Sequence, residues 1–201
     1  MKARHAVITV NVLILIFPSI ILLSLFTSEV FKHYCSYFLS LDRGRLVVFC
    51  NRVLDGDTII FDKYQYGRLA YIDAPELKQK SIDNVAIGRE SYEYLRSIIE
   101  KQTIEIKIID KDKYGRSIVR IWKHNDDNNK DNNNEEMNLK MIKEGHAILY
   151  NFALFESIEE KIKYVNCFYD AILNRRGIWS TEGLLLPYKF RKNKKILNIK
   201  Y

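Results

Sequence analysis

Two acidic residues in the chain are spaced for chemistry with a metal ion. The segment DGDT at residues 55–58 precedes the strand-like run TIIF, and its Asp-Gly pair is typical of a tight turn. A hairpin centred near Gln65 would place Asp57 opposite Asp73, because each lies eight residues from that centre. Opposed carboxylates repel each other, and a hard divalent cation between them relieves the repulsion, since Ca²⁺ and Mg²⁺ prefer oxygen ligands. The pair therefore predicts a metal site, although a turn alone would account for DGDT.

Glu76 lies on the loop that leaves the second aspartate. Pro75 ends the strand that carries Asp73, because proline cannot donate a hydrogen bond to a strand ladder. Glu76 lies three residues after Asp73, the expected metal ligand. A carboxylate in that position could take a proton from a water bound to the metal, which is the role of a general base. The alternative is an ordinary surface acid beside Lys78 and Lys80.

Two arginines supply groups that bind phosphate. Arg68 lies within a strand pattern, in GRLAY, and Arg116 ends the turn sequence KYGR. A planar guanidinium binds a phosphodiester through two parallel hydrogen bonds, and the alternative for Arg68 is an internal salt bridge to one of the acids. Strict alternation puts Arg68 and Asp73 on opposite faces of one strand, so we expect a bulge or strong twist between them.

The elements that must position these residues follow from hydrophobic periodicity. Short β-branched and aromatic runs between turn signals predict five strands, and helical spacing predicts three helices. The order βββαββαα favours a mainly β, α+β fold: an OB-fold five-stranded β-barrel with three packed helices. The expected strands are residues 46–53, 58–61, 66–72, 103–109 and 117–122, and the expected helices are residues 89–100, 137–144 and 158–174. The stripe expected to face the core in the last helix is Ile162, Val165, Phe168, Tyr169 and Ile172.

Segments outside these elements divide the chain further. Residues 124–136 hold six asparagines and five acids, which is typical of a solvated low-complexity insertion. The expected folded domain spans residues 45–182 and is followed by a basic tail, residues 183–201. Five of the seven residues from Lys189 to Lys195 are basic, so this part of the tail is either a disordered solubilising segment or a contact for nucleic acid or lipid.

Composition narrows the class of protein. The 201 residues are 47% hydrophobic and carry a formal net charge of +7, which excludes a wholly disordered chain and favours anionic partners. The three cysteines form neither a CxxC pair nor a cluster with histidine at zinc-ligand spacing, so a structural zinc site is not expected.

The N-terminus predicts a membrane segment. Residues 6–26 are almost wholly apolar and follow Lys2 and Arg4, and 21 residues of helix rise about 30 Å, enough to cross a bilayer. No small-residue pair suited to signal cleavage follows this run. We therefore expect residues 1–28 to be a single-pass membrane anchor and residues 29–44 a juxtamembrane connector. The alternatives are secretion after cleavage of a signal and targeting to an organelle.

The ordered set of short motifs resembles the staphylococcal nuclease-like (thermonuclease) family. DGDT, RLAYIDAPE, GRES, DKYGR, EGHAILY and RRGIWS occur in the family's order within residues 45–182. The resemblance implies an OB-type barrel with three helices and a Ca²⁺-dependent phosphodiesterase that acts on DNA or RNA. A membrane anchor together with a basic tail is also similar to a fungal subgroup of this family, the mitochondrial membrane endonucleases.

The resemblance implies a metal site and a general base. Asp57 and Asp73 match the carboxylate ligands of one Ca²⁺. Ala74 matches a ligand that binds through its backbone carbonyl, and it stands where the founding enzyme has threonine. Glu76 matches the general base, or the residue that orients the attacking water.

The resemblance also implies contacts with the substrate. Arg68 and Arg116 match the residues that grip the scissile phosphate and stabilise its charge in the transition state. Lys113 and Tyr114 match contacts to a neighbouring phosphate, and Tyr150 matches an aromatic residue of the nucleotide pocket.

Two functions of different classes fit the sequence. The first is the metal-dependent nuclease, with DNA or RNA as substrate, single strands favoured, and no obligate protein partner. The second is a catalytically inactive OB-type module that is tethered to a membrane and binds nucleic acid or protein. Inactive members of the family lack one or more of the acids and arginines, and this chain keeps them all, which favours the nuclease: Asp57, Arg68, Asp73, Glu76 and Arg116.

Overall fold

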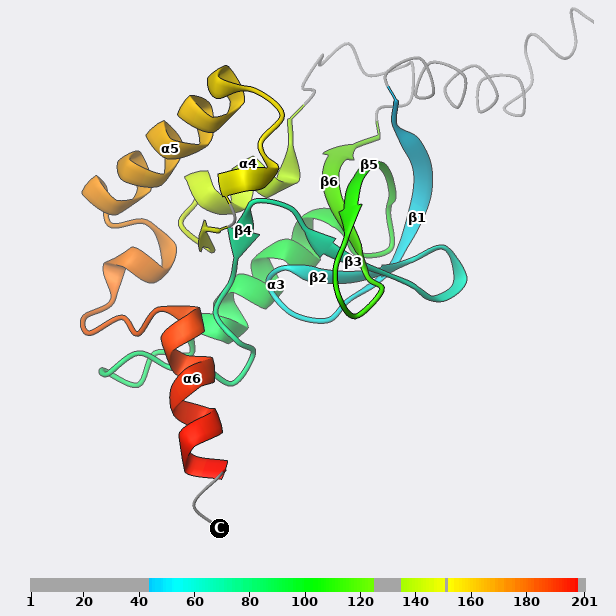
Figure 1. Cartoon of the computed structure of the whole chain (residues 1–201). Helices are drawn as coiled ribbons and strands as arrows, with labels where there is room; N and C mark the ends of the chain where they lie inside the picture. The colour runs from blue at the N-terminus through cyan, green and yellow to red at the C-terminus, as the bar shows by residue number, and fades with distance from the viewer. Residues whose placement is uncertain (1–43, 125–134, 151, 199–201) are drawn as a thin grey trace, which may run out of the picture. The chain divides into compact units, whose positions relative to one another are not determined.

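The computed structural model of the chain describes residues 44–124, 135–150 and 152–198 (Figure 1). The chain divides into two compact units, and every element described below belongs to the larger one, residues 45–124 and 132–201. The predicted anchor, almost all of the connector and most of the asparagine-rich insertion lie outside the described residues. None of the helices in the described ranges is both long and apolar enough to cross a bilayer.

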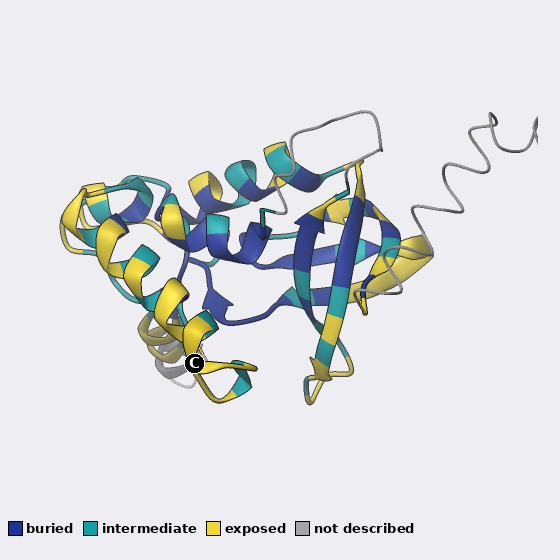
Figure 2. Cartoon of the chain, turned by 90° about the horizontal axis from the view of Figure 1, so that it is seen from above, coloured by how far each residue is buried: buried dark blue, intermediate teal, exposed yellow. Residues whose placement is uncertain are grey.

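Five strands close into a barrel in the order β1-β2-β3-β6-β5, which confirms the predicted fold class. β3 and β6 pair in parallel, and the other neighbours pair antiparallel. Apolar side chains from all five strands meet in one core, and Figure 2 shows buried residues following the strands. The barrel strands are Leu46–Val53 (β1), Thr58–Phe61 (β2), Gln65–Leu69 (β3), Thr103–Lys111 (β5) and Ser117–Lys123 (β6).

The β2–β3 hairpin has a different register from the predicted one. Thr58 pairs with Arg68, so the hairpin is centred two residues earlier than expected. The backbone of Asp57 therefore lies opposite Leu69, whose N–H donates to the Asp57 carbonyl oxygen at 2.8 Å. The prediction that Asp57 faces Asp73 across the ladder is wrong.

The turn of this hairpin explains the shift in register. It is a short 3₁₀ segment, η1 (Asp62–Tyr64), in which Asp62, Lys63 and Tyr64 have φ angles of 34°, 60° and 152°. Positive φ is costly for residues with a side chain, and none of these three is a glycine, the usual signal for such a turn. The Asp62 carboxylate supports the turn by accepting the Phe49 N–H at 3.0 Å. The sequence therefore gave no local sign of where the chain reverses.

The third predicted strand divides in two at a second turn. β4 (Ile72–Asp73) begins after Tyr71, which has a positive φ of 68°. β4 leaves the barrel and pairs with β7 (Ile148–Leu149). The turn resets the alternation of faces, so the side chains of Arg68 and Asp73 meet, and the irregularity expected between them is confirmed.

Four helices occur in the described ranges, one more than expected. The three predicted helices agree with α3, α4 and α5 to within two residues at each end. The fourth, α6, is formed by the basic tail, so disorder, one of the two alternatives for the tail, is excluded for the residues that α6 covers. The helices are Ile87–Ile99 (α3), Met137–Lys143 (α4), Ile158–Leu173 (α5) and Pro187–Asn198 (α6), and two further 3₁₀ segments are Phe152–Leu154 (η2) and Gly177–Ser180 (η3).

The buried face of α5 differs from the predicted stripe. Ile162 and Tyr169, which were expected to face the core, are 52% and 59% exposed. The fully buried residues of α5 are Tyr164 and Ala171. The Tyr164 ring packs edge-on against Tyr71, and its hydroxyl donates a hydrogen bond to a buried glutamate. A stripe chosen by apolar character alone missed this tyrosine because its polar tip has a partner in the core.

That partner, Glu136, corrects the expectation for the end of the asparagine-rich insertion. Glu136 is buried, forms a β-bridge with Trp122 and accepts hydrogen bonds from the Arg120 guanidinium and the Tyr164 hydroxyl, all at 2.8 Å. The insertion was expected to be solvated up to this residue. A buried carboxylate is stable when it is paired and hydrogen-bonded, and this network supplies both.

His146 should make the stability of the fold depend on pH. Its ring stacks on the Tyr94 ring at 4.1 Å between centroids, and burial lowers the pKa of His146 to about 4. In the unfolded chain the same group takes up a proton near pH 6.5. Because the unfolded state binds this proton first as the pH falls, we expect the free energy of unfolding to decrease from about pH 6.5 to pH 4, by at most about 1.4 kcal/mol per pH unit.

Urea unfolding of the wild type and of a His146→Phe variant at two pH values measures this effect. Phenylalanine keeps the stacking on Tyr94 and cannot titrate. We expect the wild type to lose more stability than the variant between pH 7 and pH 5. Equal losses in the two proteins would show that His146 is not the group responsible.

Candidate active site

Asp57 and Asp73 converge on one guanidinium. Arg68 donates from Nη1 to Asp57 Oδ1 and from Nη2 to Asp73 Oδ1, both at 2.8 Å. The Asp57 side chain is 5% exposed and the Asp73 side chain 0%. The Ala74 N–H donates to Asp57 Oδ2 at 2.9 Å, which ties the two acidic segments together. The structure thus brings the predicted pair together, through Arg68 and the turn after β3 and not through the hairpin register.

The segment DGDT is shaped by two local contacts. The Asp55 carboxylate accepts the Asp57 N–H at 3.0 Å, so Asp55 acts as the turn residue that the sequence suggested. A Cβ on Gly56 would lie 2.6 Å from the Ala74 Cβ and 2.9 Å from the Ser91 Cβ. Glycine is therefore required because Ala74 and helix α3 pack directly against the backbone, which holds Asp57 beside the loop that follows β4.

Arg68 only partly offsets the cost of burying the charge of Asp57. Burial raises the pKa of Asp57 to about 7, because lost hydration outweighs the favourable charge of Arg68. Burial alone would lower the pKa of Arg68, but its ion pairs with Asp57 and Asp73 raise it above the ordinary value. A further positive charge beside these carboxylates would stabilise their ionised form.

The donor set fits a hard divalent cation. Two buried carboxylates and the adjacent Ala74 carbonyl are oxygen ligands of the kind that Ca²⁺ and Mg²⁺ accept, with water completing the coordination. No group of three or more histidine, cysteine, aspartate or glutamate side chains that could hold a metal ion occurs in the described ranges. The type of these oxygen donors is therefore the basis for expecting a cation, whereas structural zinc sites are built mainly from cysteine and histidine.

Glu76 lies beside the pair on a loop that α3 holds in place. Its side chain is 42% exposed, in contrast to the two aspartates. The Glu76 N–H donates to the buried Gln79 side chain at 3.3 Å, and Gln79 in turn donates to the Leu185 carbonyl. A Cβ on Gly88 would lie 1.8 Å from the Glu76 carbonyl oxygen, so the GRES glycine permits the loop to pack on the start of α3. Glu76 is therefore on a fixed loop and has a side chain that reaches solvent.

Arg116 is held at the edge of the site by its own turn. Its Nε donates to Asp112 Oδ2 at 2.7 Å, and its guanidinium lies 5.7 Å from the Tyr114 ring centroid. The next residue, Ser117, pairs with Gly67, so the backbone at Arg116 runs beside the strand that carries Arg68. No hydrogen bond or ion pair joins Arg116 to the three acids in the part of the chain that the structure describes.

The predicted substrate contacts lie on exposed turns. Tyr114 is 73% exposed, and the Lys113 ammonium lies 5.1 Å from its ring centroid. Tyr150 is also exposed, and its N–H donates to the Tyr71 carbonyl at 2.7 Å, next to the strand that ends in Asp73. Both rings are exposed to solvent, and two cationic side chains lie near the Tyr114 ring.

The family assignment follows from comparison with known proteins. Residues 67–181 match the family model described as "Staphylococcal nuclease homologue". The chain belongs to this family. The matched segment contains Arg68, Asp73, Glu76 and Arg116, whereas Asp57 lies just ahead of it.

Individual related proteins align with most of this chain. A thermonuclease from Staphylococcus hyicus is 30% identical over 138 residues, which cover 64% of this chain and 73% of that protein. Protein ParB from Escherichia coli is 28% identical over 153 residues, which cover 75% of this chain and 79% of that protein. A protein named as an uncharacterized endonuclease, from Escherichia coli O157:H7, is 29% identical over 154 residues, which cover 75% of this chain and 86% of that protein.

One residue that contacts the acid cluster of Asp57, Asp73 and Glu76 was not identified from the sequence. Arg191, from α6, donates from Nη2 to Asp73 Oδ2 at 2.8 Å, from Nη1 to Asp73 Oδ1 at 3.2 Å and from Nη1 to Glu76 Oε1 at 3.0 Å. Figure 1 shows α6 beginning near the loop between β4 and α3, on which Glu76 lies. The basic composition of the tail predicted an anionic partner, but its pattern did not identify Asp73 and Glu76 as that partner.

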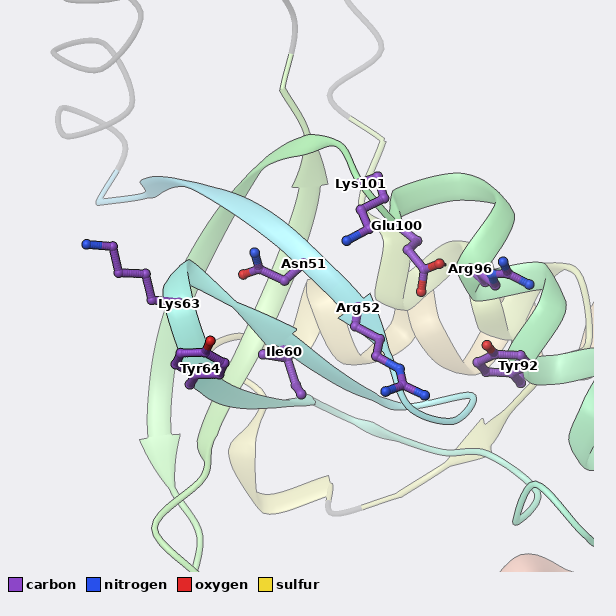
Figure 3. A pocket seen from close by; sticks show the side chains of 9 residues that line it. All are labelled: Asn51, Arg52, Ile60, Lys63, Tyr64, Tyr92, Arg96, Glu100 and Lys101. Carbon is purple, nitrogen blue, oxygen red and sulfur yellow. Dashed lines mark hydrogen bonds and ion pairs between the residues drawn. The ribbon is translucent and has the colours of Figure 1, made fainter.

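A separate polar pocket lies over the β1–β2 ladder (Figure 3). Its volume is about 700 Å³, and it is bounded by η1 on one side and the C-terminal half of α3 on the other. The pocket shares no residue with the acid cluster. Its lining is Asn51, Arg52, Ile60, Lys63, Tyr64, Tyr92, Arg96, Glu100 and Lys101.

Proposed function

We propose that the chain is a Ca²⁺-dependent endonuclease that hydrolyses phosphodiester bonds of DNA or RNA. The observation that carries the proposal is the convergence of Asp57 and Asp73, both buried, beside the accessible carboxylate of Glu76. The related proteins named as a thermonuclease and as an endonuclease support the reaction class. The three carboxylates of the site favour binding of a cation, and the net charge of +7 on the chain favours a polyanionic substrate.

The acids and the adjacent carbonyl would hold the ion. Asp57, Asp73 and the Ala74 carbonyl are the proposed ligands. When bound, a divalent cation supplies positive charge next to the scissile phosphate and lowers the pKa of a coordinated water. Glu76 accepts the proton that leaves the attacking water, because its carboxylate is accessible and its loop is fixed on α3.

The two arginines stabilise the phosphate as it gains charge. Arg68 donates one N–H from each of its two terminal nitrogens to the aspartates. Three of the five N–H groups of its guanidinium therefore remain to bind phosphate oxygens. Arg116 approaches from the neighbouring turn, already oriented by Asp112. A hydrogen-bond donor that points at the charge developing in the transition state lowers the activation barrier by about 3–4 kcal/mol.

Single-stranded substrates are favoured by the exposed aromatic rings. Tyr114 and Tyr150 are exposed and present ring faces on which unpaired bases can stack. Lys113, beside Tyr114, adds a contact for a neighbouring phosphate. We propose no obligate protein partner for this reaction.

A membrane location is a separate proposal that rests on the sequence of residues 6–26. An apolar run of this length spans a bilayer as a single helix, which would tether the nuclease domain to a membrane. The alternatives of secretion after cleavage and of an organelle membrane, including a mitochondrial one, stay open.

A cleavage assay with a matched variant tests the proposed function. The purified full-length chain and a Glu76→Gln variant are incubated with end-labelled single-stranded DNA in Ca²⁺ or in chelator. We expect cleavage by the wild type in Ca²⁺ alone, and a rate for the variant lower by about 10²-fold or more. Binding of the DNA without cleavage in any arm would favour the inactive binding module instead.

A further inference from the structure

We propose that Arg191 is a latch on the acid site, which competes with the divalent cation for Asp73 and Glu76, so that α6 leaves the acids when the metal binds. The inference rests on the proposed function, because it concerns the same site. It adds a residue and a helix that the chemistry of the site did not require.

The first argument is the number of hydrogen-bond positions that arginines fill on Asp73. A carboxylate offers about four lone-pair positions. On Asp73, Arg68 fills one and Arg191 fills two, so three are taken. The one open position is on Oδ2, which Arg191 also contacts, so a cation bound there would lie directly against the Arg191 guanidinium or displace it. Arg68 is anchored within a barrel strand, so Arg191 is the one that can leave.

The second argument is charge. With Arg191 docked, the formal charges of the three acids and two arginines sum to −1, since three carboxylates face two guanidinium groups. Removal of Arg191 leaves −2, which one divalent cation neutralises. A cation and Arg191 together would instead give these five groups and the ion a sum of +1, with two positive charges competing for the buried Asp73 carboxylate, which is unfavourable. The latch and the ion are therefore alternatives.

The third argument is that α6 makes few contacts with the rest of the domain other than the contact of Arg191 with the acids. None of the other described helices or strands packs extensively on α6. Tyr188 and Lys192 on its first turns are exposed, and Arg191 itself is 37% exposed. Undocking the helix would expose chiefly Pro187, which is buried, and Phe190, which is half-buried, and a phosphate chain offers its basic residues new partners.

Calorimetric titration of Ca²⁺ into full-length protein tests the latch without any cleavage assay. The variants are Arg191→Gln and, as a control with the same change of charge one residue away, Lys192→Gln. We expect the Kd for Ca²⁺ to fall about 10-fold in Arg191→Gln, within the usual range of coupling between sites, and less than about 2-fold in Lys192→Gln. Hydrogen exchange of the backbone amides of residues 188–193 should accelerate when Ca²⁺ is added to the wild type.

The outcomes separate the latch from the proposed metal centre. Equal Ca²⁺ affinity in wild type and Arg191→Gln, or unchanged exchange in α6 on Ca²⁺ addition, would overturn the latch and leave the nuclease standing. No Ca²⁺ binding by any of the three proteins would overturn both the metal centre and the latch.

A different observation, the pocket over the β1–β2 ladder, carries a second inference independently. Arg52, Lys63 and Lys101 line it, and no ion pair with another residue in the described ranges occupies any of the three. The strained η1 turn presents Tyr64, 86% exposed, at the rim. Strained backbone of this kind persists where the surroundings enforce it and is frequent at binding sites.

We infer that this pocket binds a phosphate and base of the nucleic-acid strand outside the cleavage site. Unpaired cations supply the contact to the phosphate, and the rings of Tyr64 and Tyr92 supply stacking surfaces, as in single-strand binding grooves. The pocket would lengthen the footprint of the strand and raise the affinity for long substrates.

Binding of a labelled 12-nucleotide DNA in chelator, which prevents metal-dependent cleavage, tests this pocket in the full-length chain. We compare Arg52→Gln/Lys63→Gln with the control Lys161→Gln/Lys163→Gln on α5, which removes the same charge from another surface. We expect about 10-fold weaker binding for the pocket variant alone, with the slope of log affinity against log salt reduced by about 1.4 for two lost phosphate contacts. Equal losses in the two variants would show only a general effect of charge and overturn the site.

Discussion

Replacing Arg68 with lysine is expected to lower kcat/KM for nucleic-acid cleavage by about 10²-fold or more. Lysine keeps the positive charge between Asp57 and Asp73, but a single ammonium cannot reproduce the fork that reaches both carboxylates and still offers donors to a phosphate. The buried carboxylate that loses its hydrogen bond should also reduce the free energy of unfolding by about 1–3 kcal/mol. Single-turnover cleavage and urea unfolding measure the two effects.

Arg89→Lys provides a matched control for this substitution. Arg89 also pairs with a carboxylate, that of Glu93, but it does so on the surface of α3 with its side chain 69% exposed. Exposed pairs contribute at most about 1 kcal/mol, so the control should cleave at the wild-type rate with little loss of stability. If Arg68→Lys behaved like the control, Arg68 would have no special role at the phosphate.

Removing the guanidinium of Arg116 should slow the chemical step by about 10²–10³-fold. Arg116 contacts only its own turn, through Asp112, among the ion pairs of the described ranges, so the change to alanine should leave the barrel intact. Its proposed role is confined to the transition state, and substrate affinity should therefore change much less than the rate. Single-turnover cleavage and DNA binding in chelator distinguish the two effects.

Arg89→Ala is the control for Arg116. Arg89 forms a comparable exposed pair, with Glu93 on α3, and lies outside the proposed chemistry. It should leave both rate and affinity nearly unchanged. A loss of DNA affinity in Arg116→Ala without a loss of rate in the bound complex would favour the binding module over the enzyme.

The barrel strands could be predicted because a short stretch of sequence is enough to identify each of them. Alternation in TIEIKII and the apolar run TIIF each identify a strand within a few residues of sequence, and the structure places β5 and β2 there. The three predicted helices were likewise found by spacing alone. The α5 stripe failed because tyrosine at position 164 was not counted as core, and the decisive partner of its hydroxyl, Glu136, lies in another segment.

The members of the candidate site could be predicted, but the way they meet could not. Asp57 and Asp73 were paired by a hairpin register that proved wrong, because the turn at residues 62–64 adopts positive φ without a glycine. The pair forms nonetheless, through Arg68. Arg191 joins Glu76 across 115 positions of sequence, and no local pattern specifies so distant an ion pair.

The dependence of the cleavage rate on Ca²⁺ tests the central claim, that Asp57 and Asp73 form the metal site of a nuclease, most directly. Single-turnover rates on single-stranded DNA are measured for the full-length wild type and for Asp57→Asn/Asp73→Asn, from chelator to saturating Ca²⁺. We predict that the wild-type rate rises with Ca²⁺ to a plateau at least about 10²-fold above the rate in chelator, while the rate of the variant stays flat. Cleavage by the wild type that is equally fast in chelator, or a variant that retains the Ca²⁺ response, would contradict this account.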